Sequence, residues 1–319
     1  MLSKCTGLTD LGLARNRIGP MGALYLADGF GKCTSLVNVG LQSNQLGEAR
    51  PSDSGVPEAF VSLVVSLAGC QNLESLFLDE NSIEGIGTDG LQRMERPGAF
   101  SALTQLSLRQ NPMGLECASN IASWLRKCSD LRVVDLAATA IGPGAEFVIE
   151  GLVGCPTLSS LNLEDNRIGW ETAARVGSML KVCTNLRTLS LARNDLRCEG
   201  IGGISEGLAK CVSLQCLQLG ENAIADRGVE ILVRVLVKLP LLTELGLASN
   251  RICNDGAFNL AMGLDRCPAL SCLELCQNHV KSEGQKALQE RAKLRGFGAA
   301  SVNLRITNQS KPNLPRLNS

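Results

Sequence analysis

The sequence is poor in aromatic residues, has one histidine and carries no net charge. Phe, Trp and Tyr make up 3% of the chain, so aliphatic side chains must fill its core. His279 is the only histidine, which leaves the commonest general base and metal ligand nearly absent. Lys+Arg and Asp+Glu both number 31, so no net field would draw the chain to nucleic acid or to an anionic membrane. We therefore expect no nucleic-acid partner.

Long apolar runs are also missing. The best candidate, residues 231–242 (ILVRVLVKLPLL), is shorter than a membrane span and contains Arg234 and Lys238. No signal peptide is recognisable, because the sequence enters a repeat pattern by Leu8. We expect a soluble protein without direct membrane insertion.

A repeated unit fills nearly the whole chain. Its ground period is 28 residues, and each unit reads LxxLxLxxNxI/L, then a glycine-containing turn, then a helical stretch. Ten leucines open the units: Leu8, Leu36, Leu73, Leu103, Leu131, Leu158, Leu186, Leu214, Leu242 and Leu270. We predict one repeat array over residues 1–307, with a degenerate last strand near 301–306, and an extended basic tail at 308–319.

Each unit should contain one short strand and one helix. The last two leucines of LxxLxL alternate at period two, so they point to the same side of a strand. The asparagine that follows would be buried and must be hydrogen-bonded, which stacking in neighbouring units permits. Nine units have this asparagine, whereas the fifth has Thr139, whose hydroxyl replaces only part of that bonding. Such a unit cannot bury its faces alone, so we predict a stacked solenoid.

This pattern resembles the leucine-rich repeat, and its 28-residue form is similar to the ribonuclease-inhibitor-like subfamily. That subfamily includes the sensor arrays of NOD-like receptors and the Ran GTPase-activating proteins. The resemblance implies an α/β horseshoe with parallel strands on its concave face and helices on its convex face. Strands repeat at about 4.8 Å, whereas helices need about 10 Å, so the helical side should be the longer one.

The fourteen cysteines do not indicate a disulfide framework. Eight of them share one position, three residues before the opening leucine, where two other units have Phe100 and Leu239. A position that accepts Cys, Phe or Leu is apolar, and reduced cysteine is a small hydrophobic residue. We therefore expect core thiols and an intracellular, reducing compartment, with the cytoplasm favoured.

Two further patterns suggest ligand sites that we do not expect. Cys272 and Cys276 face outward with Cys216, but no histidine accompanies them as a metal ligand. The segment GIGTDG (85–90) matches a dinucleotide loop, yet Gly87 occupies the turn position where other units also have glycine. We predict neither a metal site nor a cofactor.

The outward positions of the strands and the residue before each asparagine form the candidate binding face. It carries nine acids and three bases, so it should be negative and the helix side should be correspondingly basic. The acids are Asp10, Asp79, Glu80, Asp135, Glu164, Asp165, Glu221, Glu244 and Glu274, and the bases are Arg15, Arg109 and Arg193. The face could be a groove for a basic partner or a solvated surface without one.

The candidate partner-binding residues on this face are charged, apart from one aromatic residue. Phe77 is its only aromatic side chain, among several glycines and alanines. The candidate set is Phe77, Asp79, Arg109, Asp135, Glu164, Arg193, Glu244 and Glu274.

Two insertions and one chain end offer other surfaces. Extra residues occur around 47–57 and 93–98, in adjacent units, either as binding loops or as tolerated insertions. Only seven residues precede Leu8, so no cap for the first unit is visible. Either the chain is a fragment or a partner covers that end.

Taken together, these features favour a non-catalytic protein–protein interaction scaffold, including a fixed subunit of a larger assembly. No nucleophile is paired with a base, so we do not expect an enzyme. Two alternatives stay open from the resemblance: a GTPase activator similar to the Ran activator, and a substrate-recognition adaptor similar to F-box leucine-rich proteins. Against the first, we find no long acidic C-terminal run; against the second, no helical adaptor segment precedes Leu8.

Overall fold

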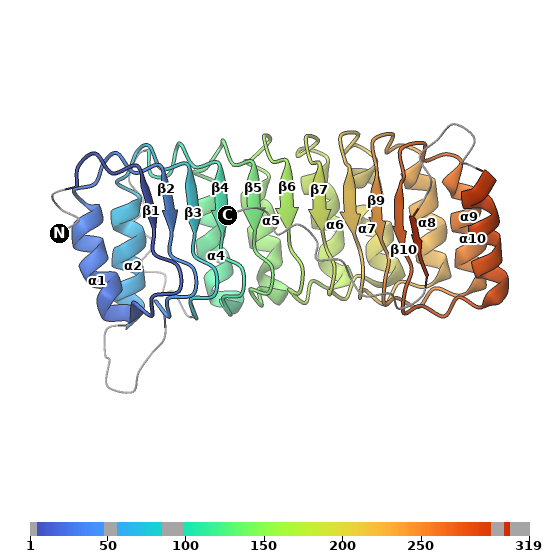
Figure 1. Ribbon diagram of the computed structural model, residues 1–319, viewed down its shortest axis with the longest axis horizontal. Coiled ribbons are helices and arrows are strands. Elements are labelled where there is room, and N and C mark those ends of the chain that lie inside the picture. Colours follow the sequence, from blue (N-terminus) through green and yellow to red (C-terminus); the bar gives the residue numbers. More distant parts are fainter. Residues whose placement is uncertain (1–4, 48–55, 85–97, 295–302, 307–319) are drawn as a thin grey trace.

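The chain forms a two-layer solenoid of strands and helices. The computed structural model describes residues 5–47, 56–84, 98–294 and 303–306. The insertions near 47–57 and 93–98 therefore lie largely outside the described residues, as do Gly87 and the predicted tail at 308–319. Figure 1 shows one layer of strands and one layer of helices stacked side by side along the long axis.

Eleven strands form a single sheet in sequence order, and each neighbouring pair is parallel. The strands are β1 (Asp10–Gly12), β2 (Asn38–Gly40), β3 (Ser75–Phe77), β4 (Gln105–Ser107), β5 (Val133–Asp135), β6 (Ser160–Asn162), β7 (Thr188–Ser190), β8 (Cys216–Gln218), β9 (Glu244–Gly246), β10 (Cys272–Glu274) and β11 (Asn303–Arg305). The last of these lies within residues 301–306 and pairs with β10.

A helix follows most strands and packs on the same side of the sheet. The described helices are α1 (Gly19–Phe30), α2 (Val56–Leu67), α4 (Gly114–Leu125), α5 (Ala145–Leu152), α6 (Trp170–Leu180), α7 (Arg197–Leu208), α8 (Asp226–Leu236), α9 (Asn254–Leu264) and α10 (Ser282–Leu294), with a 3₁₀ turn at Gly142–Gly144 before α5. In Figure 1 the row of helices extends beyond the row of strands at both ends. The helical side is thus the longer one, as the predicted horseshoe requires.

One continuous aliphatic core lies between the two layers. In the second unit Leu36, Val39 and Leu41 are fully buried, and equivalent leucines repeat this burial along the array. The middle residue of each strand points into this core, so its two neighbours point outward. The predicted leucine-rich-repeat solenoid is therefore confirmed, and so is the burial of seven of the eight repeated cysteines; Cys5 is exposed.

Candidate protein-binding face

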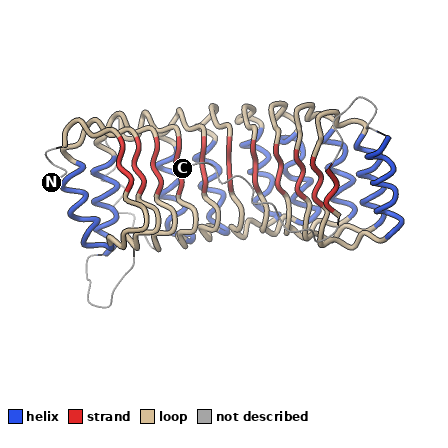
Figure 2. Tube along the Cα trace, in the orientation of Figure 1, coloured by secondary structure: helices blue, strands red, loops and turns tan. Residues whose placement is uncertain are grey.

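The outward side of the sheet is a continuous strip, which we call the strand face. It comprises the first and last residue of each strand and the two residues before each asparagine. Figure 2 shows the strands as an unbroken row in front of the helices. Four of the candidate residues lie on strands: Phe77, Asp135, Glu244 and Glu274. The other four, Asp79, Arg109, Glu164 and Arg193, follow their strands by two or three residues.

Asp79, Arg109 and Asp135 form a cluster across β3, β4 and β5. The Ser107 hydroxyl and the Arg109 backbone N–H, at 2.9 Å, both donate to Oδ1 of Asp79. The Arg109 guanidinium lies 4.0 Å from Oδ2 of Asp135. Burial raises the pKa of both aspartates above its usual value, although hydrogen bonds to each carboxylate partly oppose the shift. Both carboxylates are thus held in place by neighbouring strands.

Asn162 extends this cluster to the next unit. Its amide Nδ2 donates to Oδ2 of Asp135 at 3.2 Å, and its Oδ1 accepts from the backbone N–H of Glu164 at 3.0 Å. Glu164 therefore stands at the end of a polar chain that starts at Asp79. Four of the eight candidate residues belong to this one arrangement.

Arg193 lies between two acids that occupy the equivalent position of the neighbouring units. Its Nε is 3.9 Å from Asp165, and its NH1 is 3.7 Å from Glu221. All three residues precede the asparagine of their unit with a positive φ, which is 57° at Arg193. The equivalent residues of most other units share this left-handed turn.

The remaining acids of the set belong to a second cluster near the C-terminal end of the sheet. Gln218 donates from Nε2 to Glu244 at 2.9 Å, and Arg305 donates to Glu274 at 2.6 Å. Cys216 and Cys272 flank Glu244 in the register of β8, β9 and β10. Burial, with Glu244 nearby, raises the pKa of the Cys216 thiol to about 12. In the part of the chain that the structure describes, no three His, Cys, Asp or Glu side chains are grouped to hold a metal ion.

Phe77 belongs to neither cluster, although it borders the first one. The residues opposite it in register are Gly40 on β2 and Ser107 on β4, with Gly12 next in line on β1. The ring is half-buried, and the two glycines provide no side chains to cover it. It is an apolar spot beside the Asp79 cluster.

Four residues outside the predicted set complete these clusters: Ser107, Asn162, Gln218 and Arg305. The first three occupy the last position of a strand, so the period-two pattern could have placed them on the face. Arg305 lies between Leu304 and Ile306, so the same pattern applied to the predicted last strand could have placed it there too.

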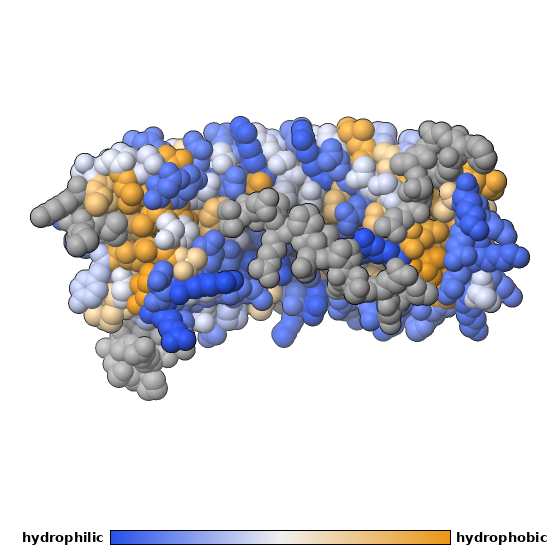
Figure 3. Space-filling model, viewed as in Figure 1, coloured by the Kyte–Doolittle hydropathy of each residue, from blue (hydrophilic) through white to orange (hydrophobic). Residues whose placement is uncertain are grey.

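The core is only partly covered at the first coil. Leu8, Leu11 and Leu13 are partly exposed, unlike the equivalent leucines of the next unit. On α1, Met21 is 57% and Tyr25 76% exposed. Figure 3 shows apolar surface over these first coils.

Comparison with a family model agrees with the repeated units of this architecture. The family model for the Leucine Rich repeat matches residues 154–171, 182–205 and 210–233. Among solved structures, an internalin (inlF) from Listeria monocytogenes is similar, with 16% identity, coverage of 98% of this chain and 90% of that chain, and a TM-score of 0.48. No helix in the described residues is long and apolar enough to cross a membrane. The matched units are therefore leucine-rich repeats of the ribonuclease-inhibitor-like type, and repeats of this kind typically mediate protein binding.

Proposed function

We propose that the protein is a non-catalytic interaction scaffold whose strand face binds a basic segment of a partner protein. The observation that carries this proposal is the charge of the face, on which nine acids stand against three bases of the repeats and Arg305 of β11. Two of those bases, Arg109 and Arg193, already lie beside acids of the same face. Because these two bases are paired with acids of the face, they repel a basic partner less than unpaired bases would.

The affinity would come from many weak contacts around one apolar anchor. A solvent-exposed ion pair contributes about 0–1 kcal/mol, so no single acid would carry the binding. Phe77 and the neighbouring glycines would receive an apolar side chain of the partner, next to the ordered Asp79 carboxylate. Because the contacts are exposed, we expect affinity to fall steeply with salt.

The partly exposed first coil supports a second contact, in which a partner covers Leu8, Leu11 and Met21. Such a contact would suit a fixed subunit of a larger assembly. None of the fourteen cysteines forms a disulfide in the described structure, which favours an intracellular, reducing compartment for that assembly.

A catalytic role has less support. Arg193 would have to leave Asp165 and Glu221 to reach the nucleotide of a bound GTPase. The described geometry likewise favours neither the adaptor function nor the GTPase-activating one over a plain scaffold.

The test is affinity purification of the tagged chain from native lysate, followed by size-exclusion chromatography, mass spectrometry and cross-linking. Two variants with the same net charge are compared. One has Glu80→Lys, Glu164→Lys and Glu221→Lys on the strand face, and its control has Asp28→Lys, Glu199→Lys and Asp255→Lys on the helices.

Proteins that co-elute with the wild type and the control, cross-link to the strand face and are lost from the face variant would support the proposal. Elution of the wild type as a lone 33.8 kDa species would contradict the fixed-subunit proposal. Equal retention of partners by both variants would contradict binding by the strand face. GTP hydrolysis stimulated in a panel of small GTPases would contradict the non-catalytic proposal.

A further inference from the structure

The positive charge that balances the strand face is not on the helices. Among the helical side chains that the structure describes, acids outnumber bases by eleven to seven. Our expectation of a basic helix side is therefore wrong. The charge has to be located in the segments that connect helices and strands.

The segments that run from the end of each helix to the next strand carry this charge. We call them the helix-to-strand rim. Within the described residues they contain nine bases and three acids. The bases are Lys32, Arg126, Lys127, Arg132, Lys181, Arg187, Lys210, Lys238 and Arg266, and the acids are Glu74, Asp130 and Asp265. All nine bases are exposed.

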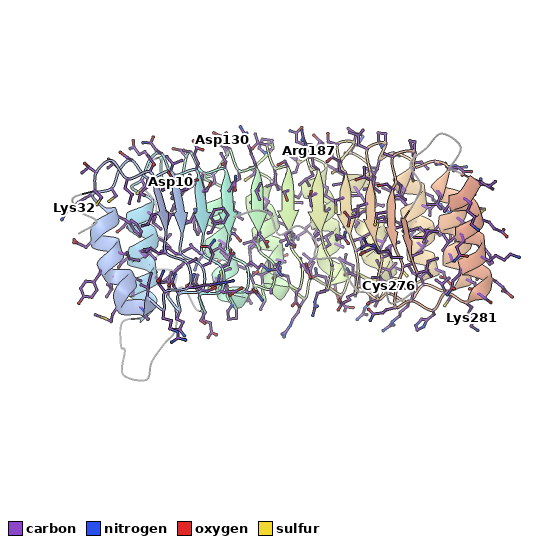
Figure 4. All side chains as sticks on the ribbon, in the orientation of Figure 1. Asp10, Lys32, Asp130, Arg187, Cys276 and Lys281 are labelled. Carbon is purple, nitrogen blue, oxygen red and sulfur yellow. The ribbon has the colours of Figure 1, made fainter. Side chains whose placement is uncertain are left out.

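These residues share one edge of the molecule. Figure 4 shows Asp130 and Arg187 along the upper edge and Lys32 at the left end near the upper end of α1, whereas Cys276 and Lys281 lie towards the lower edge. On that opposite edge, the described segments from strand to helix hold seven bases and seven acids, of which three bases and five acids belong to the strand face. One rim is thus strongly basic while the other is balanced.

Helix dipoles explain only part of this asymmetry. Cations are favoured near helix C-termini, where Lys127, Lys210 and Lys238 lie. Arg132 and Arg187, however, directly precede strands, and their backbone N–H groups donate to the carbonyls of Thr104 at 2.8 Å and Ser159 at 2.7 Å. The sheet therefore fixes these two arginines at the rim, and neither forms an ion pair within 4.0 Å among the described residues.

We infer that the helix-to-strand rim is a second binding surface, which takes an extended acidic segment of a partner protein. This inference is independent of what the strand face binds. The rim connects helices, which repeat at about 10 Å per unit, with strands, which repeat at about 4.8 Å, so its units repeat at a distance between these two values. The rim segments 68–74, 98–104 and 153–159 carry no base, whereas four consecutive units contain Arg187, Lys210, Lys238 and Arg266. An extended peptide advances about 3.3 Å per residue, so carboxylates at every second or third position match the cations of these consecutive units.

The same spacing disfavours nucleic acid as the partner. Duplex DNA presents one negative charge per about 1.7 Å, far denser than the cations of the rim. The acidic strand face of the same units would repel the excess phosphates. A peptide with spaced carboxylates avoids this repulsion.

The test uses fluorescence anisotropy of a labelled sixteen-residue peptide of alternating Glu and Gly at low salt. The rim variant has Arg132→Glu, Arg187→Glu and Lys210→Glu. The matched control has Arg17→Glu, Arg167→Glu and Arg251→Glu, three exposed bases of the opposite edge, and has the same net charge. A milder rim variant with glutamine at the three rim positions guards against misfolding, and circular dichroism checks each variant.

We expect the rim variant to bind the peptide about tenfold more weakly or worse, and the glutamine variant to lie between it and the wild type. The opposite-edge control should stay within about threefold of the wild type. Equal weakening by the rim and control variants would overturn the inference, because net charge alone would then explain binding. No binding by the wild type, or tighter binding of a single-stranded oligonucleotide of equal length, would also overturn it.

Discussion

The side-chain oxygen of Asn81 accepts a hydrogen bond from the backbone N–H of Asn44, one coil away, at 2.9 Å. The amide nitrogen of Asn81 donates at 2.9 Å to the carbonyls of Leu41, in the previous coil, and Leu78, in its own. One fully buried side chain thus satisfies backbone groups of two coils. Because this contact repeats along the array, it holds neighbouring coils together just after the strands that carry the strand face.

Removing one such amide should destabilise the array. Asn222 donates to the carbonyls of Leu191 and Leu219 at 2.8 and 3.2 Å, and its Oδ1 accepts from the backbone N–H of Leu196. Asn222→Ala leaves these buried groups unsatisfied, at a cost of about 3 kcal/mol in free energy of unfolding. Urea denaturation should show a lower midpoint with an unchanged m-value. The exposed Asn185→Ala, as control, should change the midpoint little, and an equal loss there would contradict this account.

Restoring the missing asparagine should have the opposite effect. The Thr139 hydroxyl lies 2.8 Å from both the Leu136 carbonyl and Oδ1 of Asn166, but its single proton can serve only one of them. Thr139→Asn supplies two donors and an acceptor, so we expect a gain of about 1 kcal/mol in the same urea experiment. A loss of stability would mean that the site, which is fully buried, is too small for the amide.

Most of the fold could be predicted from the sequence because each unit repeats one physical solution. Leucine spacing, the asparagine and the apolar cysteine position recur often enough to identify strands, turns and helices. Even the degenerate last strand near 301–306 is found as β11, where Leu304 and Ile306 pack on the core. The buried cysteines hold a further feature: the Cys155 thiol lies 3.4 Å from the Cys128 carbonyl, a contact that spacing alone does not reveal.

The candidate site was less predictable, because strand parity places side chains on a face without pairing them. Parity put Asp79, Arg109 and Asp135 on adjacent units, but it could not show their links through Ser107 and Asn162. The distribution of positive charge was harder still, because it depends on which edge each connecting segment occupies. Parity separates the strand face from the rest of the surface, but it does not separate the helices from the two rims.

The close contact between α6 and α7 predicts a sharp difference between two glycines of one helix. A Cβ on Gly207 would overlap the carbonyl oxygen of Gly177 and lie 2.7 Å from its carbonyl carbon, whereas a Cβ on Gly202 would meet nothing within 4 Å. Gly207→Ala should therefore lower the free energy of unfolding by about 2–3 kcal/mol. Gly202→Ala should raise it by about 0.5–1 kcal/mol through helix propensity. Similar urea midpoints for the two variants would contradict this packing.

The thiols should divide into reactive and inert groups. Burial raises the pKa of Cys155 to about 12 and that of Cys183 to about 11, so almost none of either is thiolate at pH 8. Cys5 and Cys253 are exposed. Treatment of the native protein with iodoacetamide and peptide mass spectrometry should find Cys5 and Cys253 modified, and Cys155 and Cys183 modified only after unfolding in urea. Modification of Cys155 as fast as Cys253 in the native protein would be the contrary result.

The buried carboxylate of Asp135 should make the folded protein less stable at neutral pH than it is in mild acid. Because burial raises its folded-state pKa above the unfolded value, protonation favours the folded state, and this contribution is lost as pH rises through the folded pKa. Asp135→Asn keeps an acceptor for the Ala137 N–H and removes the charge. We therefore expect a higher melting temperature for Asp135→Asn than for the wild type at pH 7, with a difference that shrinks as pH falls towards the raised pKa.

Glu80→Gln, an exposed control with the same change of net charge, should give little difference in melting temperature at pH 7. A lower melting temperature for Asp135→Asn at pH 7 would mean that the hydrogen bonds and Arg109 outweigh the cost of burying the charge.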